Sequence, residues 1–183
     1  MPIRTPTSEE LEQQRSRPDQ ELSSPQFHVV LLEPEIPNNT GSIGRTCVGL
    51  GMKLWLVRPL GFQINDRQLR RAGLDYWPHL CWEAVDDWDM LLKRLRHSTG
   101  TPAPRLWFFS KKASHLYTEV AFRPGDAFVF GRESVGLPES LLQEHAENSL
   151  RIPTSDRIRS LNVSVAVGVV AFEAARQVSL LSL

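Results

Sequence analysis

The 183-residue sequence is poor in cysteine and contains no long hydrophobic run. Its two cysteines, Cys47 and Cys81, could form at most one bridge and stand in no Cys-X-X-Cys or Cys/His spacing, which argues against a disulfide scaffold or a zinc finger. No apolar stretch approaches the length of a bilayer span, and the polar N-terminus has no hydrophobic signal core. We therefore expect no membrane association and a reducing compartment, the cytoplasm.

Several common catalytic signatures are also absent. The Gly49-Leu50-Gly51 stretch lacks the third glycine of a dinucleotide fingerprint, and the sequence has neither a GxxxxGK[ST] loop nor a GxSxG elbow. The five histidines show no ligand spacing, so we expect no metal site.

Neither sign of charge is in excess, with 21 basic and 21 acidic residues. The distribution matters more than the sum, because arginines gather in two clusters. These clusters contain Arg67, Arg70 and Arg71, and then Arg151, Arg157 and Arg159. The pattern predicts local basic patches on a neutral body.

The chain divides into a polar N-terminal segment and one domain. Residues 1–26 contain four prolines and almost no large apolar residues, so they cannot contribute much to a core and are expected to form a flexible extension. The domain is expected to span residues 27–183, which is ordinary for a single folding unit.

Short apolar runs alternate with helical patterns along this domain. Strands are predicted at 27–32, 53–57, 106–109, 127–130 and 150–152, and helices at 38–50, 66–72, 86–97, 138–145 and 161–178. Strands of this kind, apolar on both sides, are typical of a mostly parallel sheet with helices on both faces. The fold class is therefore α/β.

The last predicted helix is apolar around most of its circumference. Val163, Val165, Val169 and Phe172 point in different directions around its axis, so more than one side must be buried. In so small a chain, a partner subunit is the natural cover, and we expect a homodimer.

Three segments place glycine, proline and polar residues at predicted strand ends, where ligands bind in open α/β sheets. They are residues 37–45 (PNNTGSIGR), residues 130–138 (FGRESVGLP) and residues 150–162 (LRIPTSDRIRSLN). In the first segment, Asn38 to Thr40 offer N-caps, and the amides of the helix start favour an anion. Arg45 lies away from the buried face and leans toward Gly41.

The other two segments offer further polar groups. Glu133 could accept a hydrogen bond from a hydroxyl or pair with Arg45, Ser160 and Asn162 could cap the last helix, and Arg157 and Arg159 suit phosphates. Each segment also has a purely structural interpretation, as a capped helix or a tight loop.

Together, in this order and spacing, the three segments resemble the motifs of SPOUT-class RNA methyltransferases. Residues 69–76 (LRRAGLDY) resemble the subgroup that methylates the ribose 2′-hydroxyl at the tRNA wobble position. The resemblance spans residues 27–178. It implies an α/β fold with a deep C-terminal trefoil knot, S-adenosylmethionine as cofactor, tRNA as partner and a homodimer that buries the last helix.

The resemblance also assigns roles to single residues. It implies a cofactor pocket containing Phe109, Gly131, Ile152 and Ser160, and RNA contacts from Arg70, Arg71, Arg157 and Arg159. Arg45 matches the catalytic arginine, with Asn39, Glu133 and Asn162 as the accompanying polar residues. Ser42 and Gly44 depart from the asparagine and aliphatic residue usual in the first motif.

Two alternatives stay open from the sequence. The chain could methylate another RNA, such as ribosomal RNA, or it could bind RNA without catalysis. The absence of an added RNA-binding domain favours the minimal tRNA subgroup, and the joint presence of Arg45, Glu133, Ser160 and Asn162 favours an enzyme.

Overall fold

The computed structural model describes residues 25–64, 76–100 and 104–179. Within them, seven strands form one sheet in the order β3-β2-β1-β6-β4-β7-β5, and every neighbouring pair is parallel. The strands are β1 (His28–Leu32), β2 (Lys53–Val57), β3 (Trp82–Val85), β4 (Leu106–Phe109), β5 (His115–Leu116), β6 (Ala127–Phe130) and β7 (Ser149–Arg151).

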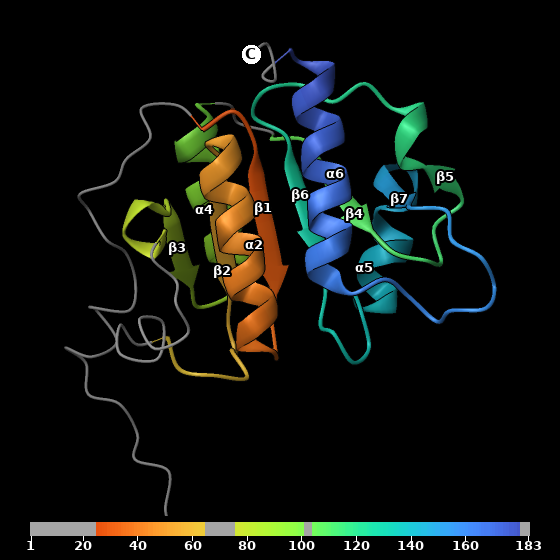
Figure 1. Cartoon of the computed structure of the whole chain (residues 1–183), viewed down its shortest axis with the longest axis horizontal. Helices are drawn as coiled ribbons and strands as arrows, with labels where there is room; N and C mark the ends of the chain where they lie inside the picture. Colours follow the sequence, from red (N-terminus) through yellow and green to blue (C-terminus); the bar gives the residue numbers. More distant parts are fainter. Residues whose placement is uncertain (1–24, 65–75, 101–103, 180–183) are drawn as a thin grey trace, which may run out of the picture.

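Helices cover both faces of this sheet. The α-helices are α2 (Pro37–Leu50), α4 (Trp88–Thr99), α5 (Glu139–Glu144) and α6 (Val163–Gln177). The described residues also include the short 3-10 helices η2 (Trp77–His79), η3 (Tyr117–Glu119) and η4 (Ala146–Asn148). Figure 1 shows α2 and α6 side by side on one face, with α4 behind the sheet. The predicted α/β fold with a mostly parallel sheet is confirmed.

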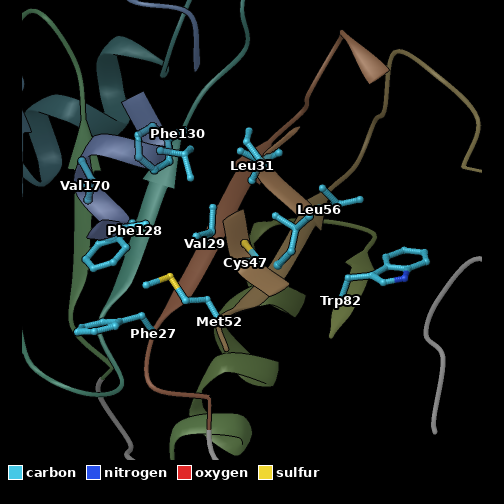
Figure 2. Packing of buried hydrophobic residues seen from close by; sticks show 14 of the residues in the cluster. Phe27, Val29, Leu31, Cys47, Met52, Leu56, Trp82, Phe128, Phe130 and Val170 are labelled. Atoms are coloured by element: carbon cyan, nitrogen blue, oxygen red, sulfur yellow. The ribbon is translucent and has the colours of Figure 1, made fainter. Parts of the chain in front are cut away.

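The central strand β1 explains why the apolar runs do not alternate with polar residues. Val29 and Leu31 pack into the core on the α2 and α6 side, while Val30 and Leu32 pack into a second core under α4. Figure 2 shows the first of these cores, where Cys47 and Val170 meet β1 and β6. A strand with helices on both faces is apolar at nearly every position, since neither face meets water.

Several boundaries differ from the sequence prediction. Strands β3 and β5 were not predicted, and β7 lies one residue earlier than expected. The apolar sequence of β3 is interrupted by Glu83, which forms ion pairs of 3.1 Å with Lys53 on β2 and Arg94 on α4. A paired glutamate is tolerated in such a strand, but in sequence it hides the apolar pattern. The expected helix at 66–72 lies outside the described residues.

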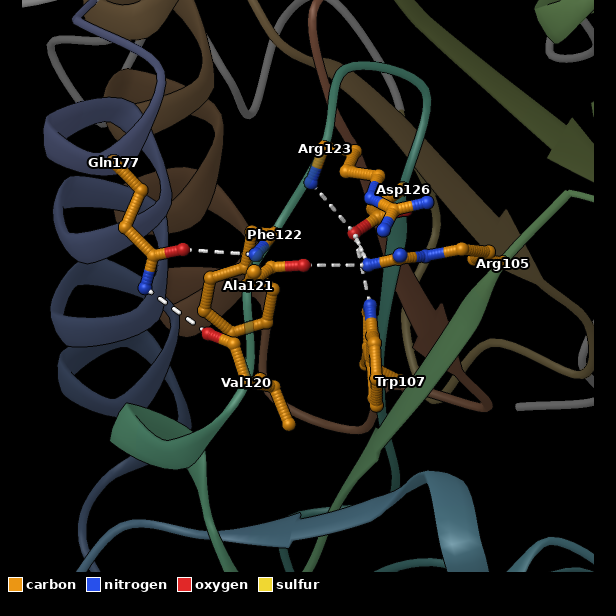
Figure 3. Close-up of polar contacts among 8 residues, drawn as sticks. All are labelled: Arg105, Trp107, Val120, Ala121, Phe122, Arg123, Asp126 and Gln177. Atoms are coloured by element: carbon orange, nitrogen blue, oxygen red, sulfur yellow. Dashed lines mark hydrogen bonds and ion pairs between the residues drawn. The ribbon is translucent and has the colours of Figure 1, made fainter.

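A buried carboxylate fixes the amino ends of β4 and β6. Asp126, 2% exposed, accepts hydrogen bonds from the Arg105 guanidinium (2.8 Å), the Trp107 indole (2.9 Å) and the Arg123 amide (2.9 Å). Figure 3 shows this cluster beside Gln177 of α6, which bonds to the backbone of Val120 and Phe122. These contacts anchor the C-terminal end of α6, so that its N-terminal end is held at the opposite edge of the sheet.

Candidate functional site

A pocket of about 750 Å³ lies at the carboxyl ends of β4, β6 and β7, the edge where parallel sheets bind ligands. Its walls come from the ends of these strands, the first turns of α2 and α6, and the two loops 131–138 and 153–162. The lining residues include Ile36, Asn39, Phe109, Lys111, Lys112, Gly131, Glu133, Leu137, Ile152, Arg159, Ser160 and Asn162.

The 131–138 loop leaves β6 through a glycine that has no space for a side chain. A Cβ at Gly131 would lie 2.2 Å from the backbone carbon of Gly136 and 2.3 Å from the Leu137 nitrogen. Gly136 has a φ of 76° and donates its amide to the Arg132 carbonyl at 2.8 Å. The loop is therefore closed on itself, and both glycines are required by its geometry.

Three polar residues from the three predicted motifs form one hydrogen-bonded chain beside the pocket. The Asn39 amide donates to Oε1 of Glu133 at 3.0 Å, and its Oδ1 accepts from the Asn162 amide at 3.0 Å. Asn162 in turn caps α6 by accepting from the Ser164 nitrogen at 2.8 Å. Asn39, at the centre of this hydrogen-bonded chain, is only 8% exposed, whereas Glu133 is half-buried and Asn162 is exposed, and together they connect α2, α6 and the 131–138 loop.

A second, reciprocal contact joins the same loop to the segment between β1 and α2. Glu133 accepts from the backbone amides of Glu35 (2.8 Å) and Ile36 (3.3 Å), and the Glu35 carboxylate accepts from the Ser134 amide (3.0 Å) and hydroxyl (2.9 Å). Arg132 adds an ion pair to Glu33. Each segment thus supplies both donors and acceptors to the other.

These contacts bear on three expectations about the first motif. Helix α2 begins at Pro37, with Ile36 as N-cap and no capping side chain, so Asn38, Asn39 and Thr40 are not the caps. An anion does lie next to this helix start, but it is the protein's own Glu133 carboxylate. Glu133 bonds to the Glu35 and Ile36 amides and to Asn39, and not to Arg45.

The pocket combines an aromatic wall with a basic rim. Phe109 and Phe130 stack with ring centroids 4.9 Å apart, and Ile152 and Leu137 add aliphatic surface. On the rim, Lys111 donates to the Ile158 carbonyl at 3.1 Å and Arg159 to the Ser134 carbonyl at 3.1 Å. Both bonds hold the 153–162 loop beside the pocket.

Arg45 lies outside the residues that line the pocket. It is exposed on α2, six residues after Asn39, and its guanidinium carbon is 4.5 Å from the centre of the Tyr76 ring. At a rise of 1.5 Å per residue, Asn39 and Arg45 are separated by about 9 Å along the helix.

The structure therefore brings together most of the predicted site residues. All four predicted cofactor residues (Phe109, Gly131, Ile152 and Ser160) line the one pocket, together with Asn39, Glu133, Asn162 and Arg159. Arg157 is exposed on the 153–162 loop, and Arg70 and Arg71 lie outside the described residues.

Sequence reasoning gave no role to Lys111, Lys112 or Glu35, and it noted Tyr76 only as the last residue of the 69–76 segment. The available signal was position, because Lys111 and Lys112 follow the end of a strand and Glu35 stands between two prolines after β1. Within the described residues, no group of three or more potential ligands could hold a metal ion, and no helix is long and apolar enough to cross a membrane.

The chain is similar to known proteins over most of its length. The model of the SpoU rRNA methylase family matches residues 26–172. A relative from Saccharophagus degradans named tRNA (cytidine(34)-2′-O)-methyltransferase is 44% identical over 156 residues, which cover 82% of this chain and 95% of the relative. A relative of the same name from Burkholderia pseudomallei is 44% identical over 153 residues, covering 82% and 95%.

Solved structures show the same fold. One, described as giving structural insights into the 2-OH methylation of C/U34 on tRNA, is 44% identical, has a TM-score of 0.76 and covers 84% of this chain and 96% of its own. A SpoU methyltransferase from Streptomyces viridochromogenes, solved in complex with AdoMet, is 21% identical with a TM-score of 0.73, covering 88% and 63%. At 21% identity, the second likeness concerns the fold alone.

Proposed function

The chain belongs to the SpoU methylase family, and from that premise we propose that it uses S-adenosylmethionine to methylate the ribose 2′-hydroxyl of the wobble cytidine or uridine in tRNA. The observation that carries the proposal is the 44% identity to tRNA (cytidine(34)-2′-O)-methyltransferases over nearly their whole length. The pocket and its polar surroundings supply the physical basis.

The pocket suits a cofactor with an aromatic base and a charged amino-acid end. Its volume of about 750 Å³ falls within the roughly 300–1,000 Å³ of ordinary ligand sites. Phe109, Leu137 and Ile152 offer apolar surface for a base, and Lys111, Arg159 and Ser160 offer polar partners. Residues Phe109, Gly131, Ile152 and Ser160 would hold the cofactor, which supplies an activated methyl group on a sulfonium.

The main task left to the protein is alignment, which is worth several kcal/mol when two reactants are held in line. We assign Asn39, Glu133 and Asn162 to this task, because their bonds to one another fix the two loops and the two helices around the pocket. They position the site and need not touch the reacting atoms.

We assign Arg45 to the substrate. Arginine stays protonated across the accessible pH range, so its planar set of donors is suited to holding the target ribose or its phosphate while the hydroxyl loses its proton. The exposed Arg157 and Arg159 would contact RNA phosphates farther from the reacting ribose, and Arg70 and Arg71 stay predicted RNA contacts.

We also propose a homodimer through α6. In the single chain, Val165 and Phe172 are 51% and 52% exposed, and they lie two turns apart on one side of this helix. A second copy would cover this apolar strip. A deep trefoil knot in the C-terminal part is supported by the placement of β7 between β4 and β5, and a cytoplasmic location by the tRNA substrate.

Methylation of ribosomal RNA is the second candidate, because the matching family model carries that description. The more similar relatives favour tRNA. An rRNA methyltransferase from Sinorhizobium meliloti is only 22% identical and this chain covers 57% of it, against 44% and 95% for the tRNA enzymes.

The test is methyl transfer to two matched tRNAs. One carries an ordinary wobble ribose, and the other a 2′-deoxyribose at that single position. We expect nuclease digestion and mass spectrometry to find one 2′-O-methyl group at position 34 of the first tRNA and none in the second. Equal methylation of both tRNAs, or methylation of ribosomal RNA alone, would overturn the tRNA assignment. Failure to bind S-adenosylmethionine in calorimetry would favour a non-catalytic RNA-binding protein.

A further inference from the structure

An aromatic side chain lies against Arg45 and has no part in the pocket. Tyr76 is 9% exposed and is the N-cap residue of η2. Its ring centre is 4.5 Å from the Arg45 guanidinium carbon, and its hydroxyl donates to the Gly41 carbonyl. In an α-helix, that carbonyl also accepts the amide of Arg45, so Tyr76 contacts the same turn at two points.

Gly44 lets this aromatic turn sit directly on α2. A Cβ at Gly44 would lie 2.9 Å from Cδ2 of Leu80, 3.3 Å from the Trp77 ring and 3.5 Å from the Tyr76 ring. A large side chain here would push the whole turn away from the helix. Gly49, farther along α2, has nothing within 4 Å of the same position and offers a matched control.

An aromatic ring holds a cation without neutralising it. The π face attracts the guanidinium, whereas a carboxylate would compensate its charge and occupy its N–H donors. A long arginine side chain loses conformational freedom against the ring before substrate arrives, which lowers the cost of ordering it later. The ring contact itself uses neither the charge nor the N–H donors with which a guanidinium binds a ribose or a phosphate.

We propose that Tyr76 is a positioning residue that, with the space left by Gly44, holds the Arg45 guanidinium ready for the tRNA ribose-phosphate; this rests on the proposed function of Arg45. Tyr76 acts only through Arg45 and touches neither cofactor nor substrate. Its effect therefore belongs to the transfer step and not to cofactor binding.

The test is a double-mutant cycle in single-turnover methyl transfer at saturating tRNA and cofactor. We expect Tyr76→Leu to slow transfer by about 10-fold to 100-fold, the scale of misplacing an aligned group, with unchanged S-adenosylmethionine affinity. Tyr76→Phe keeps the ring and should restore most of the rate. In an Arg45→Ala background, Tyr76→Leu should have no further effect. An equal loss in both backgrounds, or no loss in either, would overturn the proposal.

Two further variants test the position of the Tyr76 ring while its chemical identity is kept. Gly44→Leu should reproduce the slow transfer of Tyr76→Leu, because it displaces the ring that Arg45 contacts, while Gly49→Leu should transfer at the normal rate. If both leucine variants behave alike, close packing at Gly44 does not control Arg45.

A spectroscopic measurement keeps this proposal distinct from the proposed function. In protein with labelled arginine, the Arg45 side-chain signals should show a ring-current shift that Tyr76→Leu removes and Tyr76→Phe keeps. A protein that shows this shift but methylates no tRNA would retain the contact and refute the proposed function. A protein that methylates tRNA without this shift would retain the function and refute the positioning role.

Discussion

Replacing Asn39 by aspartate tests the polar chain that joins the three motif segments. The orientation of the Asn39 amide follows from its neighbours, because the Glu133 carboxylate only accepts hydrogen bonds and the Asn162 amide donates to Asn39 Oδ1. Asn39→Asp keeps the shape but places a second carboxylate about 3 Å from the first. Like charges so close in a site only 8% exposed cannot both ionise at low cost.

The magnitude follows from the bonds that are lost. Asn39→Ala removes one hydrogen bond to a charged group and one between neutral groups, together about 3 kcal/mol of unfolding free energy. For a chain of this size, that loss lowers Tm by about 6–12 °C. Asn39→Asp should cost more than Asn39→Ala near pH 8, because it adds repulsion to the loss of a donor.

The direction in which the stability of Asn39→Asp changes with pH tests whether the two carboxylates lie close together. Between pH 7 and 5, the folded pair of carboxylates retains one proton that the unfolded chain has lost. The variant should therefore regain stability relative to the wild type as pH falls, by up to about 1.4 kcal/mol per pH unit. Urea unfolding at several pH values measures this, with Asn38→Asp on the exposed side of the same turn as control. Equal stability of the Asn39→Asp variant and the wild type at pH 8, with no relative gain on acidification, would refute the hydrogen-bonded chain.

Three other predictions concern different parts of the molecule. Gly131→Ala should abolish S-adenosylmethionine binding in calorimetry, because the new Cβ meets the Gly136 and Leu137 backbone at 2.2–2.3 Å, whereas Gly168→Ala has open space and should leave binding intact. Burial, and then the charge of Lys53, lower the pKa of His28 from 6.5 to about 4, which favours the neutral ring in the folded state. The wild type should thus lose about 3 kcal/mol as pH falls from 6.5 to 4, and His28→Gln should remove that share of the loss in urea titrations. Phe172→Glu should give monomers in light scattering at micromolar concentration, and a monomeric wild type would contradict the dimer.

The convergence of the pocket residues could be predicted from the sequence. Phe109, Gly131 and Ile152 each stand at or just after the end of a short apolar run, and the carboxyl ends of parallel strands meet at one edge of the sheet. Asn162 carried the ordinary signal of an N-cap before an apolar helix, and it does cap α6. Strand-end position and helix capping account for where these residues lie, whereas the assignment of Phe109, Gly131 and Ile152 to a cofactor pocket came from the resemblance to the SPOUT motifs.

The partners of the polar residues could not be predicted. Asn39 lies 94 positions from Glu133 and 123 from Asn162, so only the folded sheet brings their side chains within 3.0 Å. The sequence offered Glu133 either a hydroxyl or Arg45, and within the protein it bonds to the Glu35 and Ile36 amides and not to Arg45. Local propensity also favoured asparagine caps for α2, but its N-cap is Ile36, whose amide donates to the Glu133 carboxylate of a distant loop, a contact that no local signal contains.

Helix α2 joins the two halves of the proposed site through one rigid element. Asn39 in its first turn belongs to the hydrogen-bonded chain beside the pocket, and Arg45 projects from its exposed side about 9 Å farther along the axis. A change at Asn39 shifts the whole helix and should disturb both cofactor affinity and methyl transfer. A change at Tyr76 removes the ring beside the Arg45 guanidinium and leaves the bonds of Asn39 in place, so it should disturb transfer alone. The two variants together therefore distinguish a helix that orients its arginine from an arginine that acts independently of the pocket.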